Sequence, residues 1–171
     1  MAQAPLILGV GNPLFGDDGF GIEAVRRLRA CPELAAWEIL DGGTAGIYLL
    51  PALENRSRVI LIDAVNFGGA PGAVLRLRNG DIPRGLALKL SEHQVTVKEV
   101  LALLELLDTQ PEEVLLVGVQ PEHLRFSEPL SGAVRAALDE VCRLVVAEAE
   151  SAKGAPPDAP AESLDECAIP A

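Results

Sequence analysis

The sequence predicts a doubly wound α/β fold, a three-layer sandwich around a mostly parallel sheet of about five strands, in which one edge strand could run antiparallel. Three observations support this prediction. Short apolar runs alternate along the chain with helix-like segments. The clearest of these runs is continuously apolar, as in strands that are covered on both faces. A length of 171 residues, of which 49% are hydrophobic, suits one domain with one sizeable core.

The first half of the chain is expected to supply three strands and two helices. Residues 5–10 are apolar and stop at a Gly-Asn-Pro turn, which predicts a buried first strand. Residues 21–29 carry apolar side chains on one face only, which predicts an amphipathic helix. A second strand is expected at 37–40, closed by a polar, glycine-rich stretch, with a helix at 46–53. The β-branched run 58–62 ends at an aspartate and predicts the third strand.

The second half continues the alternation. Residues 73–78 alternate apolar side chains with arginine, a pattern typical of an exposed edge strand. A helix is expected at 96–107, beginning near Ser91, and the last strand at 113–119. Residues 129–150 predict a long closing helix.

Residues 1–151 are therefore predicted to form a single domain. From about Ala152 the composition changes to Ala, Pro, Asp, Glu and Ser, which predicts a disordered acidic, Pro- and Ala-rich tail at 152–171. No apolar run approaches the roughly 20 residues that span a bilayer. The N-terminus has no charged segment followed by a long apolar stretch, so the expected location is the cytoplasm.

Charge and cysteine content narrow the function. The formal net charge of -11 argues against a nucleic-acid-binding basic face. It suits a basic or metal-carrying partner, or serves only solubility. Cys31, Cys142 and Cys167 include no C-x-x-C pair, so a zinc ribbon or thioredoxin-type site is not indicated. The first two are expected to be ordinary buried or half-buried thiols, and Cys167 is expected to be exposed.

Polar side chains follow the predicted strands at the points where ligand sites of such folds lie. Asp17 and Asp18 follow the first strand, Asp41 the second and Asp63 the third, and His93 starts the next long helix. Carboxylate oxygens and an imidazole nitrogen could together hold a divalent ion such as nickel or zinc, with positions open for another ligand. The sequence therefore predicts a three-ligand site made of Asp18, Asp63 and His93.

Each of these residues also has a structural interpretation. Asp17 or Asp18 could cap the first helix, because aspartate is favoured at a helix N-terminus. Asp63 could cap a loop, and His93 could be an exposed first-turn residue. His123, the other histidine, is interpreted as a surface loop residue that could reach the site.

A dinucleotide-binding interpretation fails on particular residues. Gly9-Val10-Gly11, with Asp41 as the ribose-binding acid, resembles the start of that motif. Leu14 stands where the third glycine is needed, Pro13 removes an amide donor, and the two aspartates that follow would repel a pyrophosphate. Zinc-protease, nucleophile-elbow and Walker A motifs are absent from the sequence.

Spaced blocks of the sequence resemble the hydrogenase maturation endopeptidases over residues 6–146. The blocks are Gly9-Val10-Gly11-Asn12 with Asp17-Asp18-Gly19-Phe20-Gly21, Asp41-Gly42-Gly43-Thr44-Ala45-Gly46, Ile62-Asp63-Ala64, Ser91-Glu92-His93-Gln94 and Val117-Gly118-Val119-Gln120-Pro121-Glu122. The order and spacing of these blocks make chance agreement very improbable.

The resemblance implies an endopeptidase that removes the C-terminal extension of a nickel-loaded hydrogenase large-subunit precursor. It implies metal contacts and catalysis by Asp18, Asp63 and His93, with nickel supplied by the precursor and no organic cofactor. The first acid is often glutamate in this family, so Asp18 is one methylene shorter. Substrate recognition falls on Asp41, Gly42, Gly43 and Thr44. The alternative is a non-enzymatic nickel-sensing assembly factor.

Overall fold

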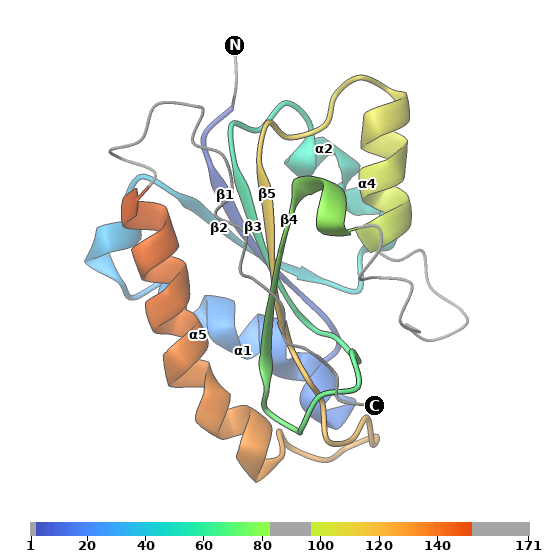
Figure 1. Ribbon diagram of the computed structural model, residues 1–171, viewed down its shortest axis with the longest axis vertical. Coiled ribbons are helices and arrows are strands. Elements are labelled where there is room, and N and C mark those ends of the chain that lie inside the picture. The colour runs from blue at the N-terminus through green and yellow to red at the C-terminus, as the bar shows by residue number, and fades with distance from the viewer. Residues whose placement is uncertain (1–2, 83–96, 152–171) are drawn as a thin grey trace, which may run out of the picture.

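The computed structural model describes residues 3–82 and 97–151, and these contain one five-stranded sheet (Figure 1). The strand order is β2-β1-β3-β5-β4, in which β4 alone runs antiparallel to its neighbour and lies at an edge. The predicted mostly parallel α/β sheet with an antiparallel edge strand is confirmed. The strands are β1 (Leu6–Val10), β2 (Glu38–Gly43), β3 (Val59–Ala64), β4 (Val74–Arg78) and β5 (Val114–Val119).

Helices cover both faces of the sheet and complete three layers (Figure 1). The α-helices are α1 (Phe20–Leu28), α2 (Leu50–Leu53), α4 (Val97–Leu106) and α5 (Gly132–Ser151). Short 3-10 turns are η1 (Gly16–Gly19), η2 (Pro32–Leu34), η3 (Gly46–Leu49) and η4 (Asn79–Asp81). Helices α1 and α5 share one face, and α2 and α4 lie on the other.

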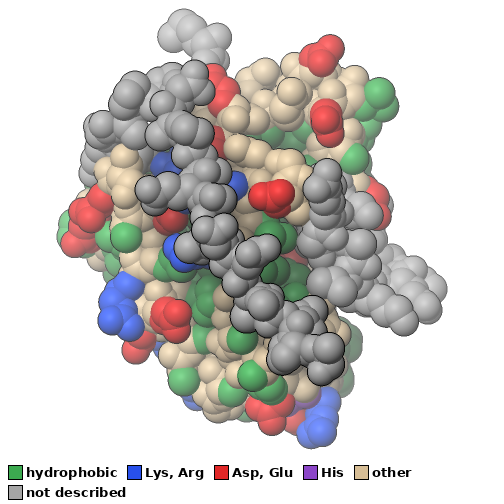
Figure 2. All heavy atoms as spheres, in the orientation of Figure 1, with side chains coloured by type: hydrophobic (Ala, Val, Ile, Leu, Met, Phe, Trp, Pro, Cys, Tyr) green, Lys and Arg blue, Asp and Glu red, His purple; other side chains and the backbone are tan. Residues whose placement is uncertain are grey.

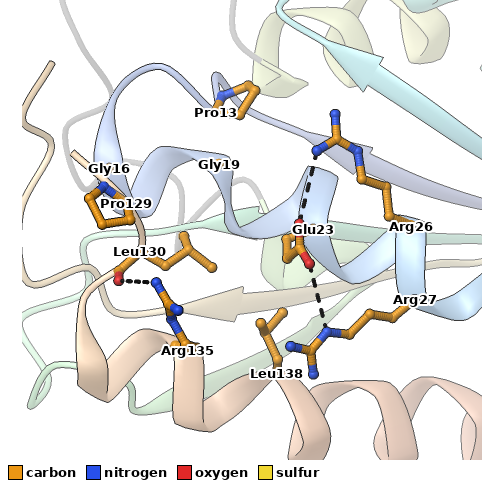
Figure 3. Close-up of a pocket in the computed structure, with 10 residues that line it drawn as sticks. All are labelled: Pro13, Gly16, Gly19, Glu23, Arg26, Arg27, Pro129, Leu130, Arg135 and Leu138. Carbon is orange, nitrogen blue, oxygen red and sulfur yellow. Dashed lines mark hydrogen bonds and ion pairs between the residues drawn. The ribbon is translucent and has the colours of Figure 1, made fainter. Parts of the chain in front are cut away.

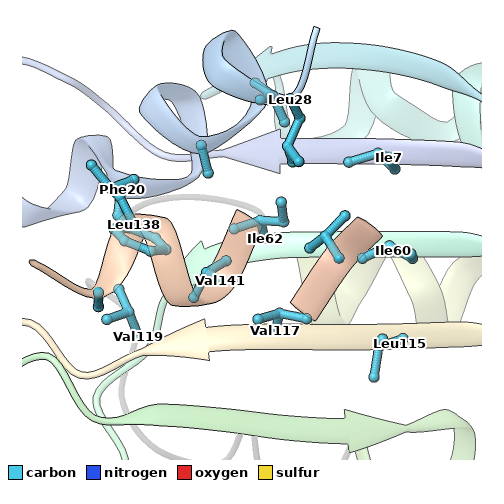
Figure 4. Close-up of a cluster of buried hydrophobic side chains, with 14 of the residues drawn as sticks. Ile7, Phe20, Leu28, Ile60, Ile62, Leu115, Val117, Val119, Leu138 and Val141 are labelled. Atoms are coloured by element: carbon cyan, nitrogen blue, oxygen red, sulfur yellow. The ribbon is translucent and has the colours of Figure 1, made fainter. Parts of the chain in front are cut away.

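The core is divided by the sheet because strand side chains alternate between its faces. Ile60 and Ile62 of β3 pack with α1 and α5 (Figure 4). Val59 and Leu61 point to the opposite face and pack with α2 and α4. Both sets are buried, which explains the continuous apolar sequence of this strand.

Most predicted elements are confirmed within a residue or two, and the differences concern the end of β2, the end of β3, the helix predicted at 46–53 and the start of α5. Strand β3 continues through Asp63 to Ala64 instead of stopping before the aspartate. The helix predicted at 46–53 is a 3-10 turn followed by one α-helical turn. Helix α5 starts at Gly132 rather than 129, and the Ser131 hydroxyl oxygen accepts a hydrogen bond from the Val134 amide at its start. The predicted start of α4 near Ser91 lies outside the described residues.

The second strand was predicted too short. The composition of Asp41, Gly42 and Gly43 predicts a turn, but these residues belong to β2. Gly9 pairs with Asp41 and Val10 with Gly43, so Gly42 forms a bulge between them. A Cβ atom on Gly42 would come within 2.7 Å of Leu8, and Gly43 has φ +49°, so both positions favour glycine. These glycines therefore bend a strand rather than end it.

The remaining predictions concern the thiols, the tail and the surface. Cys31 and Cys142 are free and half-buried, as predicted, and burial raises the pKa of Cys142 to about 11. The predicted tail at 152–171, including Cys167, lies outside the described residues. Across residues 3–82 and 97–151, no helix combines the length and apolar character needed to cross a bilayer. On the face drawn in Figure 2, Lys and Arg side chains are scattered among acidic and apolar ones.

Candidate functional site

Two of the predicted metal ligands, Asp18 and Asp63, come together where β1 and β3 end. Gly11, with φ +126°, and Gly16, with φ +58°, let the chain leave β1 and turn into η1. The Asp18 carbonyl lies so close to Gly11 that a Cβ atom there would be 1.9 Å from its oxygen. The Asp18 Oδ2 atom accepts a 2.8 Å hydrogen bond from the Asn12 amide. This turn therefore fixes the carboxylate of Asp18 beside the end of β1.

Asp63 is a buried carboxyl, only 7% exposed. Its Oδ1 atom accepts a 2.8 Å hydrogen bond from the Ala64 amide, and no donor from the described residues reaches Oδ2. Burial raises the pKa of Asp63 well above its ordinary value, and the nearby charge of Asp18 raises it further. Burial also raises the pKa of Asp18, although the Asn12 amide opposes that rise. Such a pair favours either a shared proton or a bound cation.

Asp17 has a different role from its neighbour. Its carboxylate is fully buried and accepts hydrogen bonds from the amides of Glu122 (2.8 Å), His123 (3.1 Å) and Ser131 (2.6 Å). Burial alone would raise the pKa of Asp17, but these backbone donors outweigh it and hold the pKa below its ordinary value. Neither η1 nor α1 has a side-chain cap, so the interpretation of Asp17 or Asp18 as a helix cap is wrong.

The loop between β5 and α5 forms one wall of the site, and two of its residues were not assigned a role from sequence. Buried Gln120 accepts hydrogen bonds from the amides of Phe67 and Gly69 and donates one to Asn66, which orders the loop after β3. The side chain of His123 is 16% exposed and packs on Gly16, where a Cβ atom would be 2.6 Å from Nδ1. His123 is therefore a wall residue rather than a surface loop residue. The sequence signal for these two residues is the run Gln-Pro-Glu-His, which directly follows a buried strand and so falls where ligand sites of this fold lie.

The predicted recognition segment lies at the end of β2. Asp41 is half-buried, and its Oδ1 accepts a 3.1 Å hydrogen bond from the Gly43 amide. The Gly11 amide donates a 2.9 Å hydrogen bond to the Gly43 carbonyl, which joins this segment to the turn after β1. Gly42 is buried and Thr44 is exposed. The segment thus borders the same edge of the sheet as Asp18.

His93, the third predicted ligand, lies outside the described residues. Among the residues that are described, no three His, Cys, Asp or Glu side chains are grouped closely enough to hold a metal ion. The described part of the site is therefore the carboxyl pair Asp18 and Asp63 alone.

Exposed apolar side chains border the carboxyl pair. Leu14 and Phe15 precede η1, and Leu124 and Phe126 come from the β5–α5 loop, with exposures from 39% to 66%. The rings of Phe15 and Phe126 pack 5.4 Å apart, and the Ser127 amide donates a 2.7 Å hydrogen bond to the Leu14 carbonyl. We call these four side chains the apolar rim. Exposed apolar groups gathered beside a polar site are typical of protein-binding surfaces.

The fold and the site together define a class of protein. This is an α/β protein with a buried carboxyl pair at the carboxyl edge of a parallel sheet, an arrangement suited to acid–base hydrolysis or to binding a cation. Residues 22–148 match the hydrogenase maturation protease (HycI) family. The chain therefore belongs to this family, and it is an endopeptidase.

Individual relatives support the assignment. The chain is 40% identical over 146 residues to the hydrogenase expression/formation protein HupD of Rhodobacter capsulatus, covering 84% of this chain and 68% of that protein. It is 38% identical over 144 residues to the hydrogenase 2 maturation protease of Escherichia coli, covering 83% and 88%. Its structure matches the hydrogenase maturating endopeptidase HybD from Escherichia coli with a TM-score of 0.79 and 36% identity, covering 88% and 94%. The two Escherichia coli proteins are named as a protease and an endopeptidase, which favours the enzyme over the alternative of a non-enzymatic assembly factor.

Proposed function

We propose that this endopeptidase removes the C-terminal extension of a nickel-loaded hydrogenase large-subunit precursor in the cytoplasm. The observation that carries the proposal is the burial of Asp63 beside Asp18. Two carboxylates so placed repel each other, and a cation delivered between them would remove that repulsion. The nickel ion of the precursor would be this cation, so that only a metal-loaded precursor is held productively.

His93 is proposed as the third contact to the nickel ion. Asp63 follows Leu61 at the two-residue period of β3, so it points to the face covered by α4. Thr109, just after α4, accepts a hydrogen bond from Asn55 ahead of β3, so α4 begins toward the carboxyl edge of the sheet. His93 lies outside the described residues and precedes Val97, the first residue of α4, by four positions in the sequence. The direction of α4 is the observation that supports His93 as a contact.

In a second scheme, the carboxyl pair shares a proton instead of holding the nickel ion, and it performs the hydrolysis itself. With one proton shared between Asp18 and Asp63, the ionised carboxylate would accept a proton from the attacking water, and the protonated one would donate to the departing amine. This is an aspartic-type scheme, and it requires no ion resident in the enzyme. Nickel bound in the precursor would position the scissile peptide and polarise its carbonyl.

Two surfaces would bind the rest of the precursor. The segment from Asp41 to Thr44 borders the site and is proposed to select the substrate. The apolar rim suits a folded protein substrate, because it offers exposed aromatic and aliphatic groups that a short polar peptide would not cover.

The proposal is tested by the intact mass of a candidate precursor, nickel-loaded or nickel-free, after incubation with the enzyme. Loss of the extension from the nickel-loaded form alone is the expected result. His93→Ala should abolish processing with no change in the thermal unfolding temperature. Cleavage of both forms would refute metal recognition, and normal processing by His93→Ala would refute the role of that residue.

A further inference from the structure

A cleft that neither Asp18 nor Asp63 lines has a volume of about 300 Å³ and lies between η1, α1 and the start of α5 (Figure 3). Arg26 and Arg27 reach it from α1, and Arg135 reaches it from α5. Pro13, Leu130 and Leu138 give it apolar walls. We call this cavity the arginine cleft.

The arginine cleft contains more positive than negative charge. Glu23 lies 3.9 Å from Arg26 and 3.8 Å from Arg27, and Asp139 lies 2.8 Å from Arg27. Arg135 makes no ion pair with any described residue, and its guanidinium donates only to the Leu130 carbonyl, at 3.2 Å. Three guanidinium groups thus face two carboxylates, in a chain whose formal net charge is -11. A locally positive cleft on so acidic a protein is suited to an anion.

The arginine cleft and the carboxyl pair share one turn of backbone. Gly16 and Gly19 line the cleft and lie on either side of Asp17 and Asp18. Asp18 belongs to the carboxyl pair, and Gly19, the next residue, lines the arginine cleft. Neighbouring Cα atoms are about 3.8 Å apart, so the two sites share adjacent backbone. An extended peptide of roughly three to five residues could cross this turn and occupy both.

We propose that the arginine cleft binds a carboxylate of the precursor, an acidic side chain close in sequence to the segment held at Asp18 and Asp63. This inference rests on the proposed function and adds a recognition site to it. The two sites then bind groups of opposite charge: the carboxyl pair binds a cation and the arginine cleft binds an anion. One precursor segment is positioned by both.

The charge balance selects a carboxylate over a phosphate. Glu23 pairs with Arg26 and Arg27, and Asp139 pairs with Arg27, so three guanidinium groups and two carboxylates leave an excess of about one positive charge. That excess matches one carboxylate rather than a phosphate of nearly two negative charges. Arginine also pairs with planar carboxylates through two parallel hydrogen bonds. Arg135, which has only a carbonyl partner, is the residue best placed to make that pair.

The first test is the steady-state cleavage of nickel-loaded precursor by Arg135→Gln, with Arg29→Gln as the matched control. Arg29 is an exposed arginine at the end of α1 that does not line the cleft. Arg135→Gln should raise KM about fivefold and leave kcat within about twofold, as for a partly exposed ion pair. Arg135→Lys keeps the charge and should recover part of the loss. The difference in KM between Arg135→Gln and the wild type should become smaller at high salt. Equal KM values for Arg135→Gln and Arg29→Gln would overturn the proposal.

A second test does not depend on cleavage. A terminally blocked hexapeptide of glutamate is titrated into ¹⁵N-labelled enzyme while the arginine Nε–Hε signals are followed by NMR. The signals of Arg26 and Arg135 should shift, and that of Arg29 should not. Equal shifts at Arg29 would overturn the peptide site. Equal affinity of the enzyme for acetate and for the hexapeptide would also overturn it, and would indicate that the cleft binds a small free carboxylate instead. If no precursor is cut while Arg26 and Arg135 still respond, the proposed function fails and the anion site stands.

Discussion

The Asp17 carboxylate accepts a 2.6 Å hydrogen bond from the Ser131 amide, across 114 positions of sequence. With the amides of Glu122 and His123, this bond joins the turn that carries Asp18 to the loop that precedes α5. Asp17→Asn would replace one acceptor oxygen by a donor facing these amides. We expect a loss of about 2–4 kcal/mol in the free energy of unfolding, measured with chemical denaturant. A loss below about 0.5 kcal/mol would contradict this role.

Acid unfolding provides an independent check on Asp17. Its pKa is lowered in the folded state, so the unfolded chain binds the proton more readily. The stabilisation is therefore present above the ordinary aspartate pKa of 3.8 and is lost as the pH falls through the lower folded value. The free energy of unfolding of Asp17→Asn, measured by denaturant titration at each pH, should not show this decrease.

Asp63→Asn should separate activity from stability. The substitution removes a buried charge that is repelled by Asp18, so the fold should be as stable as the native one or more so at neutral pH. Processing should fall roughly a hundredfold or more, because a proton-transfer group is lost. Asp108→Asn, at an exposed position after α4, is the control for both measurements. A normally active Asp63→Asn enzyme would exclude this carboxyl from the reaction.

The pH dependence of Asp63 has the opposite sign from that of Asp17. Because the pKa of Asp63 is raised in the folded state, the folded protein binds its proton more readily than the unfolded chain. The wild-type free energy of unfolding should thus decrease as the pH rises above the ordinary value of 3.8 toward the folded pKa. Denaturant titrations across this range should show a smaller decrease for Asp63→Asn.

Gly21 sets how closely α1 approaches the sheet beneath the site. A Cβ atom on Gly21 would lie 2.3 Å from the Ile62 carbonyl oxygen and 2.4 Å from that of Val10. Both are backbone atoms of central strands, so Gly21→Ala should destabilise the protein by at least about 2 kcal/mol. Gly132→Ala, at the start of α5 with no atom within 4 Å, should change stability by less than about 1 kcal/mol. Equal melting temperatures for the two variants would contradict this packing argument.

Phe126→Ala tests the apolar rim. Phe126 is 66% exposed, so its removal should cost little stability, but it should raise KM for the precursor roughly fivefold or more if the ring contacts the substrate. Leu106, 80% exposed at the end of α4, provides the control Leu106→Ala. If both variants process the precursor like the wild type, the apolar rim is not part of the substrate-binding surface.

The sheet could be predicted from sequence because its signals are local. The apolar run of β3 and the alternation of arginines in β4 depend only on neighbouring residues and on burial. The end of β2 could not be predicted in this way. Asp41-Gly42-Gly43 has the composition of a turn, and only its pairing with Gly9 and Val10, some 30 residues earlier, keeps it in the sheet.

The candidate site, like the sheet, could be predicted from sequence only in part. Strand ends bring Asp18 and Asp63 together, and the fold class alone was enough to predict this. Adjacent aspartates cannot be told apart by position, however. Asp17 points to three amides of a loop more than 100 residues away, while Asp18 faces the site. The contact of His123 with Gly16 is likewise a tertiary contact that no local pattern specifies.

The bond between Asp17 and Ser131 also has a consequence for the synthesis of the chain. A nascent chain carries Asp18 and Asp63 long before it contains the loop that the Asp17 carboxylate holds in place. Until Ser131 has left the ribosome, the buried Asp17 lacks its shortest hydrogen bond and one wall of the site is unfinished. Completion of the site therefore depends on a residue from the last part of the domain, although both of its carboxylates come from the first half.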